Sequence, residues 1–596
     1  MRRFSLSSVR RALATGPVAF LAVGALYAAG ATPAAADVIV GGAGPSTQVI
    51  VALDGDGGTA GAEELVTRAG GSVRRRLPVV HGFAASLPVS ALPSLAALPG
   101  VRSITPNARG HLMSLDPALG YDPDTDEGSM SWIADMLKVT DVWHDGITGQ
   151  GVDVALVDSG VARVPGLTGG NVVDGPDLSF ESQHADVRYV DTFGHGTHMA
   201  SIIAGRDSGW TPDAEGPQPD SGTFAGIAPD ARVVSLKVAA SDGSADVSQV
   251  IAAIDWVTQH AHDNRLNIRV LNLSYGTDGT QGYALDPLSY AVEQAWRHGI
   301  VVVVAAGNDG SSRQELANPA TNPYVVAVGA DDPNGTMSVS DDVVPAFAQR
   351  GTSGRRVDVI APGVHVLGLR APNGFVDQNN PGGRVGTRFI RGSGTSQATA
   401  VASGVAALIL QKYPDATPDQ VKYLLRSSAK ALPAAPDLWE GLGVLDAKEA
   451  VASSPAGAPV QSHSAATGLG TLDGARGSSH VVLDDVALTG ERDVFGRSWT
   501  AATWAAAAAG STSWSGGTFN GSTWTGDGWA TGDGWSAAAW VETDWTGSAW
   551  TSRTWVSRTW VDNGWDSRTW VDNVWDSRTW VSRTWVGSSW ADASWS

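Results

Sequence analysis

The sequence contains no cysteine among its 596 residues, which excludes disulfide bonds, thiolate metal ligands and a cysteine nucleophile. Positive charge is scarce as well: 40 lysines and arginines face 60 aspartates and glutamates, for a formal charge of −20. This balance argues against a nucleic-acid partner, because binding to the phosphate backbone depends on basic side chains. Long apolar runs are also missing, since no segment after residue 30 reaches the roughly 20 residues of a membrane-spanning helix. Packing, and bound ions where there are any, must therefore stabilise the fold.

The first 36 residues have the parts of an export signal. Four arginines lie within the first eleven residues, residues 18–30 form a short apolar core, and Ala34–Ala36 places small residues before a cleavage point ahead of Asp37. The apolar core is too short for a comfortable membrane span. We therefore expect a signal peptide at residues 1–36 and a secreted, extracellular protein.

A chain of this length allows roughly three or four domains, and residues 47–107 form the first. Predicted strands and helices alternate there in the order β-α-β-β-α-β, which is the order of a ferredoxin-like plait. Strand-like runs lie at Val49–Leu53, within residues 74–87 and at Val101–Ile104, and helical stretches lie at Gly61–Gly70 and Leu92–Leu98. On this pattern alone, the unit could equally be a freestanding binding domain.

From Ser131 onward, strand-like runs alternate with helical patterns, which predicts an α/β domain with a mostly parallel sheet flanked by helices. Strands are expected at residues 152–157, 232–238, 270–273 and 300–305, and helices at 132–143, 195–204, 247–260, 290–297 and 417–431. In such sheets, ligands bind beyond the carboxyl ends of the strands. Asp158 lies at one such end and is a candidate site residue.

Residues 392–410 contain a second candidate, Ser396. Small residues open the segment, and an uncharged run of apolar and small residues continues to Leu410, which predicts a helix buried on all sides. Ser396 would lie at the N-terminus of that helix, where the partial positive charge favours a nucleophile and an oxyanion. Taken alone, the same Gly-Thr-Ser pattern also fits an ordinary helix N-cap.

His195 lies between two glycines, at a turn that opens a predicted helix, so its imidazole can project into a cleft. His198 follows three residues later, and such a pair could instead bind a metal. Asp191 is the one carboxylate close by in the sequence, and no third histidine completes a recognisable metal motif. We therefore interpret His198 as structural and His195 as the residue that acts in the chemistry.

Asn308 follows the apolar run at residues 301–306 and lies in a glycine-containing turn. Asparagine and glycine both favour turns, which is one interpretation. The other is that the side-chain amide is a fixed N–H donor for an oxyanion. The position alone does not separate the two.

Taken together, three candidates follow the order Asp158, His195, Ser396, which is the subtilisin order among the convergent triads. The chain resembles a subtilisin-like serine protease, or subtilase, over roughly Ser131–Ala452. The matching stretches are Val157–Gly160, Gly194–His198, Gly226–Pro229, Leu271–Gly276, Ala305–Asn308, Gly394–Ser396 and Gly441–Ala447. The resemblance implies a subtilisin-like peptidase domain at residues 131–453.

The N-terminal unit shares in this resemblance. His81–Ala85 and Pro99–Ile104 resemble the inhibitor-type propeptide of subtilisin-like proteases. The resemblance implies that residues 47–107 assist folding, act as an intramolecular inhibitor and are removed by cleavage after Asn107.

The resemblance also implies a role for each matched residue. Ser396 attacks the peptide carbonyl, His195 accepts its proton and returns it to the leaving amine, and Asp158 orients His195. Asn308 and the backbone N–H of Ser396 stabilise the oxyanion. The residues that match the two substrate-pairing strands are Ser274, Tyr275 and Gly276, and Ala305, Ala306 and Gly307.

Some positions depart from the usual subtilase pattern without removing a catalytic group: Gln397, Ala400, Val401 and Ser201. An alignment through Pro319 places Ala317 near the base of the first specificity pocket, which predicts a preference for large apolar or aromatic side chains. The chemistry requires no cofactor. Subtilases often hold structural calcium, but the insert at residues 207–222 matches no recognisable metal motif, so the metal site is left unknown.

The C-terminal part has a different composition. Residues 454–495 are rich in Ser, Ala and Gly at their start and are predicted to be a linker, with one short strand at His480–Leu483. In residues 496–596, tryptophans recur mostly every five residues, with Phe519 in one such place and a slip of one residue between Trp529 and Trp535. This spacing fits a β-solenoid or a repeating hairpin, with a low-complexity tail as the alternative. Aromatic ladders of this kind suit binding to carbohydrate or a cell-wall polymer.

We therefore predict a secreted serine endopeptidase that acts on polypeptides through an acyl-enzyme and is made as a self-processing precursor. The alternative is a self-maturing cell-surface or wall-binding protein, in which the Trp-rich tail has the main function.

Overall fold

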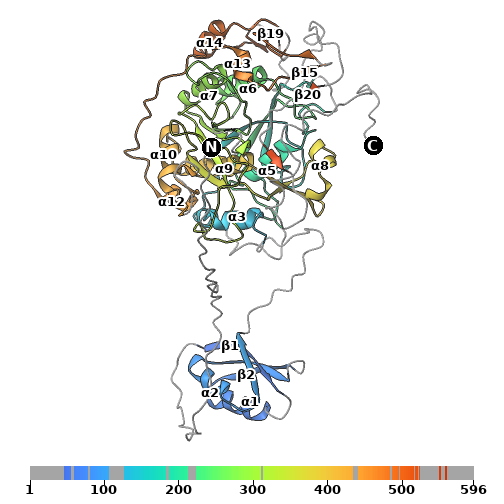
Figure 1. Ribbon diagram of the computed structural model, residues 1–596, viewed down its shortest axis with the longest axis vertical. Helices are drawn as coiled ribbons and strands as arrows, with labels where there is room; N and C mark the ends of the chain where they lie inside the picture. Colours follow the sequence, from blue (N-terminus) through green and yellow to red (C-terminus); the bar gives the residue numbers. More distant parts are fainter. Residues whose placement is uncertain are drawn as a thin grey trace, which may run out of the picture. The chain divides into compact units, whose positions relative to one another are not determined.

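The computed structural model describes residues 46–54, 59–77, 81–106, 126–182, 187–212, 223–310, 313, 315–433, 440–483, 486–494, 497–515, 517–520, 522–523, 550–551 and 557–559. The predicted signal peptide, the junction at 107–125 and most of the Trp-rich tail lie outside these residues. The chain divides into two compact units, Met1–Leu112 and Met113–Ser596, and Figure 1 draws the elements of the first in blue.

The first unit is a four-stranded antiparallel sheet with two helices. Its elements are β1 (Ser46–Leu53), α1 (Thr59–Arg68), β2 (Ser72–Leu77), β3 (Gly82–Pro88), a 3-10 turn (Val89–Ala91), α2 (Leu92–Ala96) and β4 (Val101–Pro106). The strand order is β2-β3-β1-β4, with β1 antiparallel to both neighbours. Val51, Phe83 and Leu95 are fully buried in its core. The predicted ferredoxin-like order is therefore present.

A seven-stranded parallel sheet forms the centre of the second unit. In order across the sheet, its strands are β11 (Val359–Pro362), β10 (Val326–Asp331), β9 (Val301–Ala305), β8 (Ile268–Leu273), β5 (Asp153–Asp158), β7 (Arg232–Lys237) and β6 (Val172–Asp177). Every residue of β9 is buried, because a parallel strand is covered on both faces. The predicted subtilisin-like α/β sheet is confirmed, and the four predicted strands all belong to it.

Helices pack beside the sheet as two pairs. α5 (His195–Ala204) packs against α9 (Thr395–Lys412), and α6 (Val247–His260) packs against α7 (Pro287–Arg297). Figure 1 shows α6 and α7 on the side that also carries α13 (Leu472–Arg476) and α14 (Ala501–Ala509). α9 is buried from Thr395 to Leu410, as predicted for a helix in the core. α6 begins with a capping box formed by Asp246 and Gln249.

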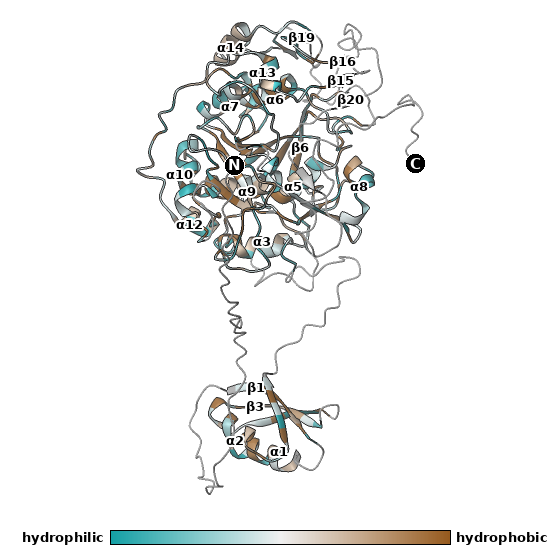
Figure 2. Cartoon of the chain, viewed as in Figure 1, coloured by the Kyte–Doolittle hydropathy of each residue, from teal (hydrophilic) through white to brown (hydrophobic). Residues whose placement is uncertain are grey.

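The remaining elements of the peptidase domain surround this core: α3 (Met130–Met136), α4 (Val139–His144), β12 (Val366–Leu369), α8 (Phe375–Asn379), a 3-10 turn (Pro381–Gly383), β13 (Arg384–Val385), β14 (Phe389–Gly394), α10 (Pro418–Ser428) and α12 (Ala447–Ala452). The helix predicted at 132–143 is broken, because Lys138 adopts a left-handed conformation with φ of 59°. Figure 2 shows α10 largely in hydrophilic colours and many of the sheet strands in hydrophobic ones. Within the described ranges, no helix is long and apolar enough to cross a membrane.

The chain remains packed on the second unit beyond residue 453. This C-terminal extension, residues 454–523, carries α13, β15 (Val482–Leu483), β16 (Val486–Ala487), α14, β17 (Trp514–Ser515), β18 (Thr518–Phe519) and β19 (Ser522–Thr523). Arg476 pairs with Asp246, the N-cap residue of α6, at 2.6 Å, and both side chains are fully buried. Trp504 Nε1 donates a hydrogen bond to Asp255 at 2.8 Å. The structure therefore differs from the predicted linker at 454–495, because single side chains along the segment anchor it to α6.

Two short strands of the Trp-rich tail are described. β20 (Trp550–Thr551) pairs with β15, and β21 (Ser557–Thr559) pairs with β14, both antiparallel. The first tryptophans of the repeat, Trp499 and Trp504, are buried in the extension with ring centroids 5.2 Å apart. The predicted solenoid otherwise falls on residues outside the described ranges.

Candidate active site

Asp158 and His195 meet at the carboxyl end of the sheet. Asp158 is the last residue of β5, and His195 is the first residue of α5. His195 Nδ1 lies 2.8 Å from Asp158 Oδ1 and 2.9 Å from Oδ2, and neither side chain is exposed. Since a carboxylate can only accept, this contact requires the Nδ1–H tautomer, in which Nε2 is the basic ring nitrogen.

Ser396 lies at the N-terminus of α9, the second residue of that helix. Its Oγ has no hydrogen-bond partner within the part of the chain that the structure describes. The N-cap residue of α9 is Gly394, and no side chain caps the start of this helix. The alternative interpretation of Ser396 as an ordinary N-cap is therefore wrong.

Asn308 ties the end of β9 to the start of α9. Its Oδ1 accepts hydrogen bonds from the Thr395 N–H at 2.9 Å and from Thr395 Oγ1 at 3.0 Å. The Gly307 N–H in turn donates to Thr395 Oγ1 at 3.2 Å. These bonds fix the orientation of the amide, so that its Nδ2 is the end that can donate to a ligand.

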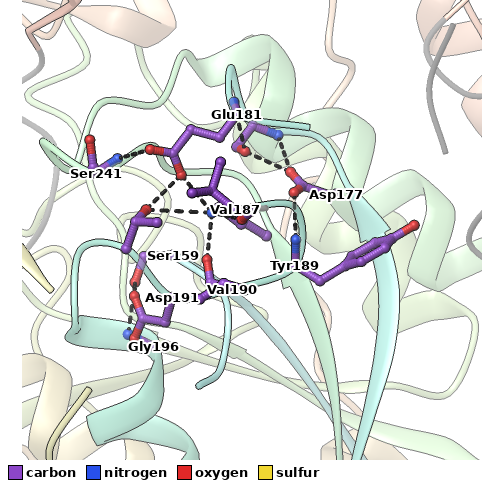
Figure 3. A network of polar contacts seen from close by, with 12 residues as sticks. Ser159, Asp177, Glu181, Val187, Tyr189, Val190, Asp191, Gly196 and Ser241 are labelled. Carbon is purple, nitrogen blue, oxygen red and sulfur yellow. Dashed lines mark hydrogen bonds and ion pairs between the residues drawn. The ribbon is translucent and has the colours of Figure 1, made fainter. Parts of the chain in front are cut away.

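Asp191 and Ser159 hold the turn that opens α5, as Figure 3 shows. Asp191 Oδ1 accepts from Ser159 Oγ at 2.8 Å and from the Gly194 N–H at 2.6 Å, and Oδ2 accepts from the Thr197 N–H at 2.7 Å and its Oγ1 at 2.6 Å. Ser159 Oγ accepts from the Gly196 N–H at 2.9 Å. Burial raises the pKa of Asp191, which these hydrogen bonds oppose.

Sequence reasoning considered Asp191 only as a metal ligand. The signal that it missed is the placement of a carboxylate three residues before a helix-opening glycine, which is typical of a side chain that satisfies the first N–H groups of a helix.

A buried ion pair lies beside this turn (Figure 3). Lys237 Nζ lies 2.6 Å from Glu181 Oε2, with the two side chains 1% and 7% exposed. Lys237 also donates to the Val190 carbonyl at 2.5 Å, and Glu181 accepts from the Ser241 N–H at 2.9 Å. The chain leading into Asp191 is therefore fixed from β7 as well as from α5.

His198 contacts two backbone carbonyls through one ring nitrogen. Its Nε2 lies 3.1 Å from the Ile390 carbonyl and 3.2 Å from the Val366 carbonyl, which identifies Nε2 as a donor to β14 and β12. Burial, followed by the charge of His195, lowers the pKa of His198 to about 3. In the described part of the chain, no three His, Asp or Glu side chains are grouped to hold a metal ion. The interpretation of His198 as structural agrees with these contacts.

The two predicted substrate-pairing segments lie side by side. Ser274–Gly276 follows β8 and Ala305–Gly307 ends β9, and these strands are parallel neighbours. Gly307 has φ of 113°, and a Cβ there would lie 1.7 Å from Gln349 Oε1, so only glycine fits. The Ala317 N–H donates to the Ala306 carbonyl at 2.8 Å. Ala317 thus lies next to the second segment, and its predicted place at the base of the first specificity pocket stays a prediction.

Comparison with known proteins matches the subtilase family to residues 149–444, and a family described as "Putative peptidase inhibitor domain" to residues 41–107. Serine protease AprX of Bacillus subtilis (strain 168) is 37% identical over 312 residues, covering 51% of this chain and 67% of that protein. Subtilisin DY of Bacillus licheniformis is 32% identical over 318 residues, covering 53% of this chain and 96% of that protein. The solved structure of fervidolysin from Fervidobacterium pennivorans has 24% identity and a TM-score of 0.43, over 70% of this chain and 62% of that one.

Proposed function

Because this chain belongs to the subtilase family and is a subtilisin-like serine endopeptidase, we propose that Ser396 is its nucleophile and that hydrolysis passes through an acyl-enzyme. One observation carries the assignment. The imidazole of His195 is held by Asp158 at the carboxyl end of β5, in the same unit as a serine hydroxyl that has no partner among the described residues. Subtilases need no cofactor for this chemistry.

Each residue then has one task in the reaction. His195 Nε2 takes the proton of Ser396 Oγ as the oxygen attacks the peptide carbonyl, and later gives that proton to the leaving amine. Asp158 holds the Nδ1–H tautomer and stabilises the imidazolium. The N-terminus of α9 directs its partial positive charge towards the developing oxyanion.

Asn308 completes the oxyanion site in this proposal. We expect Asn308→Ala to lower kcat by about 10²–10³-fold with KM nearly unchanged, which is the scale known for the equivalent asparagine of subtilisin itself. The reason is that an amide donor aimed at the oxyanion acts in the transition state more than in the substrate complex. Steady-state kinetics on a peptide p-nitroanilide measures both constants.

The control for this prediction is Thr395→Val, which removes one of the two hydrogen bonds that orient the Asn308 amide. It should cost less in kcat than Asn308→Ala, because the Thr395 N–H still holds Oδ1. If Asn308→Ala lowered only the Tm and left kcat intact, the asparagine would be a turn residue and the oxyanion role would be wrong.

The pH dependence of hydrolysis tests the base. We expect kcat/KM to fall steeply on acidification, because protonated His195 cannot accept the Ser396 proton. His198 cannot cause this loss, since its pKa of about 3 keeps it neutral throughout. The measurement is kcat/KM from about pH 5 to about pH 9, with circular dichroism as the check that the fold persists. A flat profile across that range would contradict the triad.

The precursor forms part of the proposal. The N-terminal unit matches an inhibitor domain at residues 41–107, which supports a propeptide that inhibits the enzyme in cis and is removed by self-cleavage beyond residue 107. The signal-like first 36 residues support secretion. The expected partners are therefore polypeptide substrates outside the cell and the protein's own propeptide.

Substrate preference follows from the first specificity pocket. A substrate strand adds between Ser274–Gly276 and Ala305–Gly307 by main-chain hydrogen bonds. Ala317, which is 7% exposed, contributes a small uncharged side chain beside Ala306. We propose a preference for large apolar or aromatic residues on the acyl side of the cleaved bond. Cell-wall or carbohydrate binding by the tail remains the alternative main function, and it rests on residues that are largely outside the described ranges.

A further inference from the structure

Asp331 and Asp342 form a buried carboxyl pair. Asp331 ends β10, and the chain returns to it because Asp332 and Val343 exchange two backbone hydrogen bonds, of 2.9 and 3.0 Å. Asp331 is 0% exposed and Asp342 is 3% exposed. None of their four carboxylate oxygens accepts a hydrogen bond from a donor group of the described residues, and the two carboxyls lie close enough to each other to share a proton. The fold has thus buried four acceptor atoms without a side-chain donor.

This pair differs from the other buried carboxylates of the described chain. Each of the others accepts at least one hydrogen bond, and several are paired with a cation: Asp153, Asp158, Asp177, Glu181, Asp191, Asp246, Asp255, Asp286, Glu293, Asp358, Asp377, Glu440, Asp446 and Asp493. A buried carboxylate normally needs such a partner, because losing its hydration is costly. Among the described residues, Asp331 and Asp342 interact with each other but receive no such donor or cation, so the pair needs a proton or a bound cation to neutralise it.

The charged groups that act most strongly on the pair are further carboxylates, those of Asp332 and Asp341. Burial raises the pKa of Asp331 well above its usual value, and the charges of Asp342 and Asp332 raise it further. Burial raises the pKa of Asp342 to about 6, opposed by a hydrogen bond with Asp331 and assisted by the charges of Asp341 and Asp332. The Asp332 N–H lowers the pKa of Asp331 slightly because it favours the ionised carboxylate. This N–H donates its hydrogen bond to the Val343 carbonyl, however, and not to Asp331. At neutral pH the pair consequently needs either a shared proton or a cation.

We propose that Asp331 and Asp342 bind a divalent cation of the calcium type. Ionised carboxylates are acceptors only, and Ca²⁺ takes about six to eight oxygen ligands at sites of this chemistry. Two carboxylates supply up to four of them, and no third acidic side chain of the described residues is grouped with them, so the remaining ligands would have to be main-chain carbonyls or water. A proton shared between the two carboxyls competes with the cation.

The site is connected to the nucleophile through the backbone. The Asp331 carbonyl accepts from the Gly363 N–H at 2.9 Å, and the Gly363 carbonyl accepts from the Gly394 N–H at 2.8 Å. Gly394 is the N-cap of α9, two residues before Ser396. The cation would therefore stabilise the segment that positions the nucleophile, without touching the reacting atoms.

The test uses the full chain carrying Ser396→Ala, so that self-digestion does not obscure the result. After treatment with EDTA and dialysis, isothermal titration counts bound Ca²⁺, and the Tm is followed as CaCl₂ is added. We expect Asp331→Asn/Asp342→Asn to bind one Ca²⁺ fewer than the parent. In the parent, Ca²⁺ at a hundred-fold excess over its Kd should raise the Tm by about 5 °C, and the double variant should not show this rise.

The matched control is Asp145→Asn/Asp415→Asn, which removes the same two charges from exposed positions and should keep both the stoichiometry and the Tm response. Equal binding in the parent and in the Asp331/Asp342 variant would overturn the proposal. A parent that binds no Ca²⁺ would also overturn it. In that case a proton occupies the pair, and its stabilising effect, present in acid, is lost as the pH rises through about 6. If the double variant does not fold, Asp342→Asn alone should weaken Ca²⁺ binding at least about ten-fold.

Discussion

Replacing Ser396 with alanine is expected to lower kcat for an unfolded protein substrate by about 10⁶-fold, the scale known for the nucleophile of subtilisin itself. Alanine has no oxygen that can form the acyl-enzyme, so only the oxyanion donors and substrate binding remain to assist attack by water. KM should change little, because the methyl group leaves the substrate-pairing segments intact. Hydrolysis of casein and of a peptide p-nitroanilide measures the loss.

Two further observations make this result specific. His195→Ala should cost about as much as Ser396→Ala, and the double variant should be no slower than either, because residues that act as one unit are not additive. Self-cleavage of the precursor between residues 107 and 130 should stop as well. If folded Ser396→Ala still hydrolysed protein, the assignment of the nucleophile would be lost. If the wild type cleaved only itself, the protein would be better described as a self-maturing surface module.

Arg476→Met is expected to destabilise the enzyme by about 3–5 kcal/mol, because it leaves Asp246 buried without its cation. Burial alone would raise the pKa of Asp246. The charge and hydrogen bonds of Arg476, together with hydrogen bonds from Ser248, outweigh burial, so the pKa of Asp246 lies below its usual value. Methionine keeps much of the side-chain volume, so the loss reports the charge together with the hydrogen bonds that Arg476 donates to the Gly490 and Arg492 carbonyls. Thermal unfolding in the Ser396→Ala background should show a fall in Tm of roughly 5–10 °C.

The matched control is Arg476→Met/Asp246→Asn. Asparagine still caps α6 but carries no charge, so the double variant should recover the part of the lost Tm that comes from the unpaired charge, and not the part from the Gly490 and Arg492 carbonyls. The loss in Arg476→Met should also shrink on acidification, because a protonated Asp246 no longer needs a cation. If Arg476→Met were as stable as the parent at neutral pH, the contact between α13 and Asp246 would not contribute to stability.

The sequence predicts most of the peptidase fold because its signals are local. Strand β9 is a run of four valines, α9 is an uncharged run, and both are buried as those patterns indicate. The turns with Asp158, His195, Asn308 and Ser396 carry recognisable motifs. Their common location beyond the strand ends follows from the parallel sheet.

The features that could not be predicted depend on contacts between distant residues. Arg476 lies in a polar stretch that has the composition of a linker, and only its pairing with a residue 230 positions earlier reveals its burial. Asp331 and Asp332 precede Pro333, Asn334 and Gly335, which is a typical turn sequence. Nothing local indicates that one of these carboxyls is fully buried beside Asp342.

The separation between Asp246 and Arg476 sets an order of events during synthesis. The carboxylate leaves the ribosome first, and its cation follows 230 residues later, which takes about 10–50 s at translation rates of 5–20 residues per second. Until then, a nascent chain that already contains Asp158, His195 and Ser396 still has an unneutralised acid beneath α6. The N-terminus of α6 therefore reaches its final packing only after the extension has emerged and Arg476 has joined Asp246.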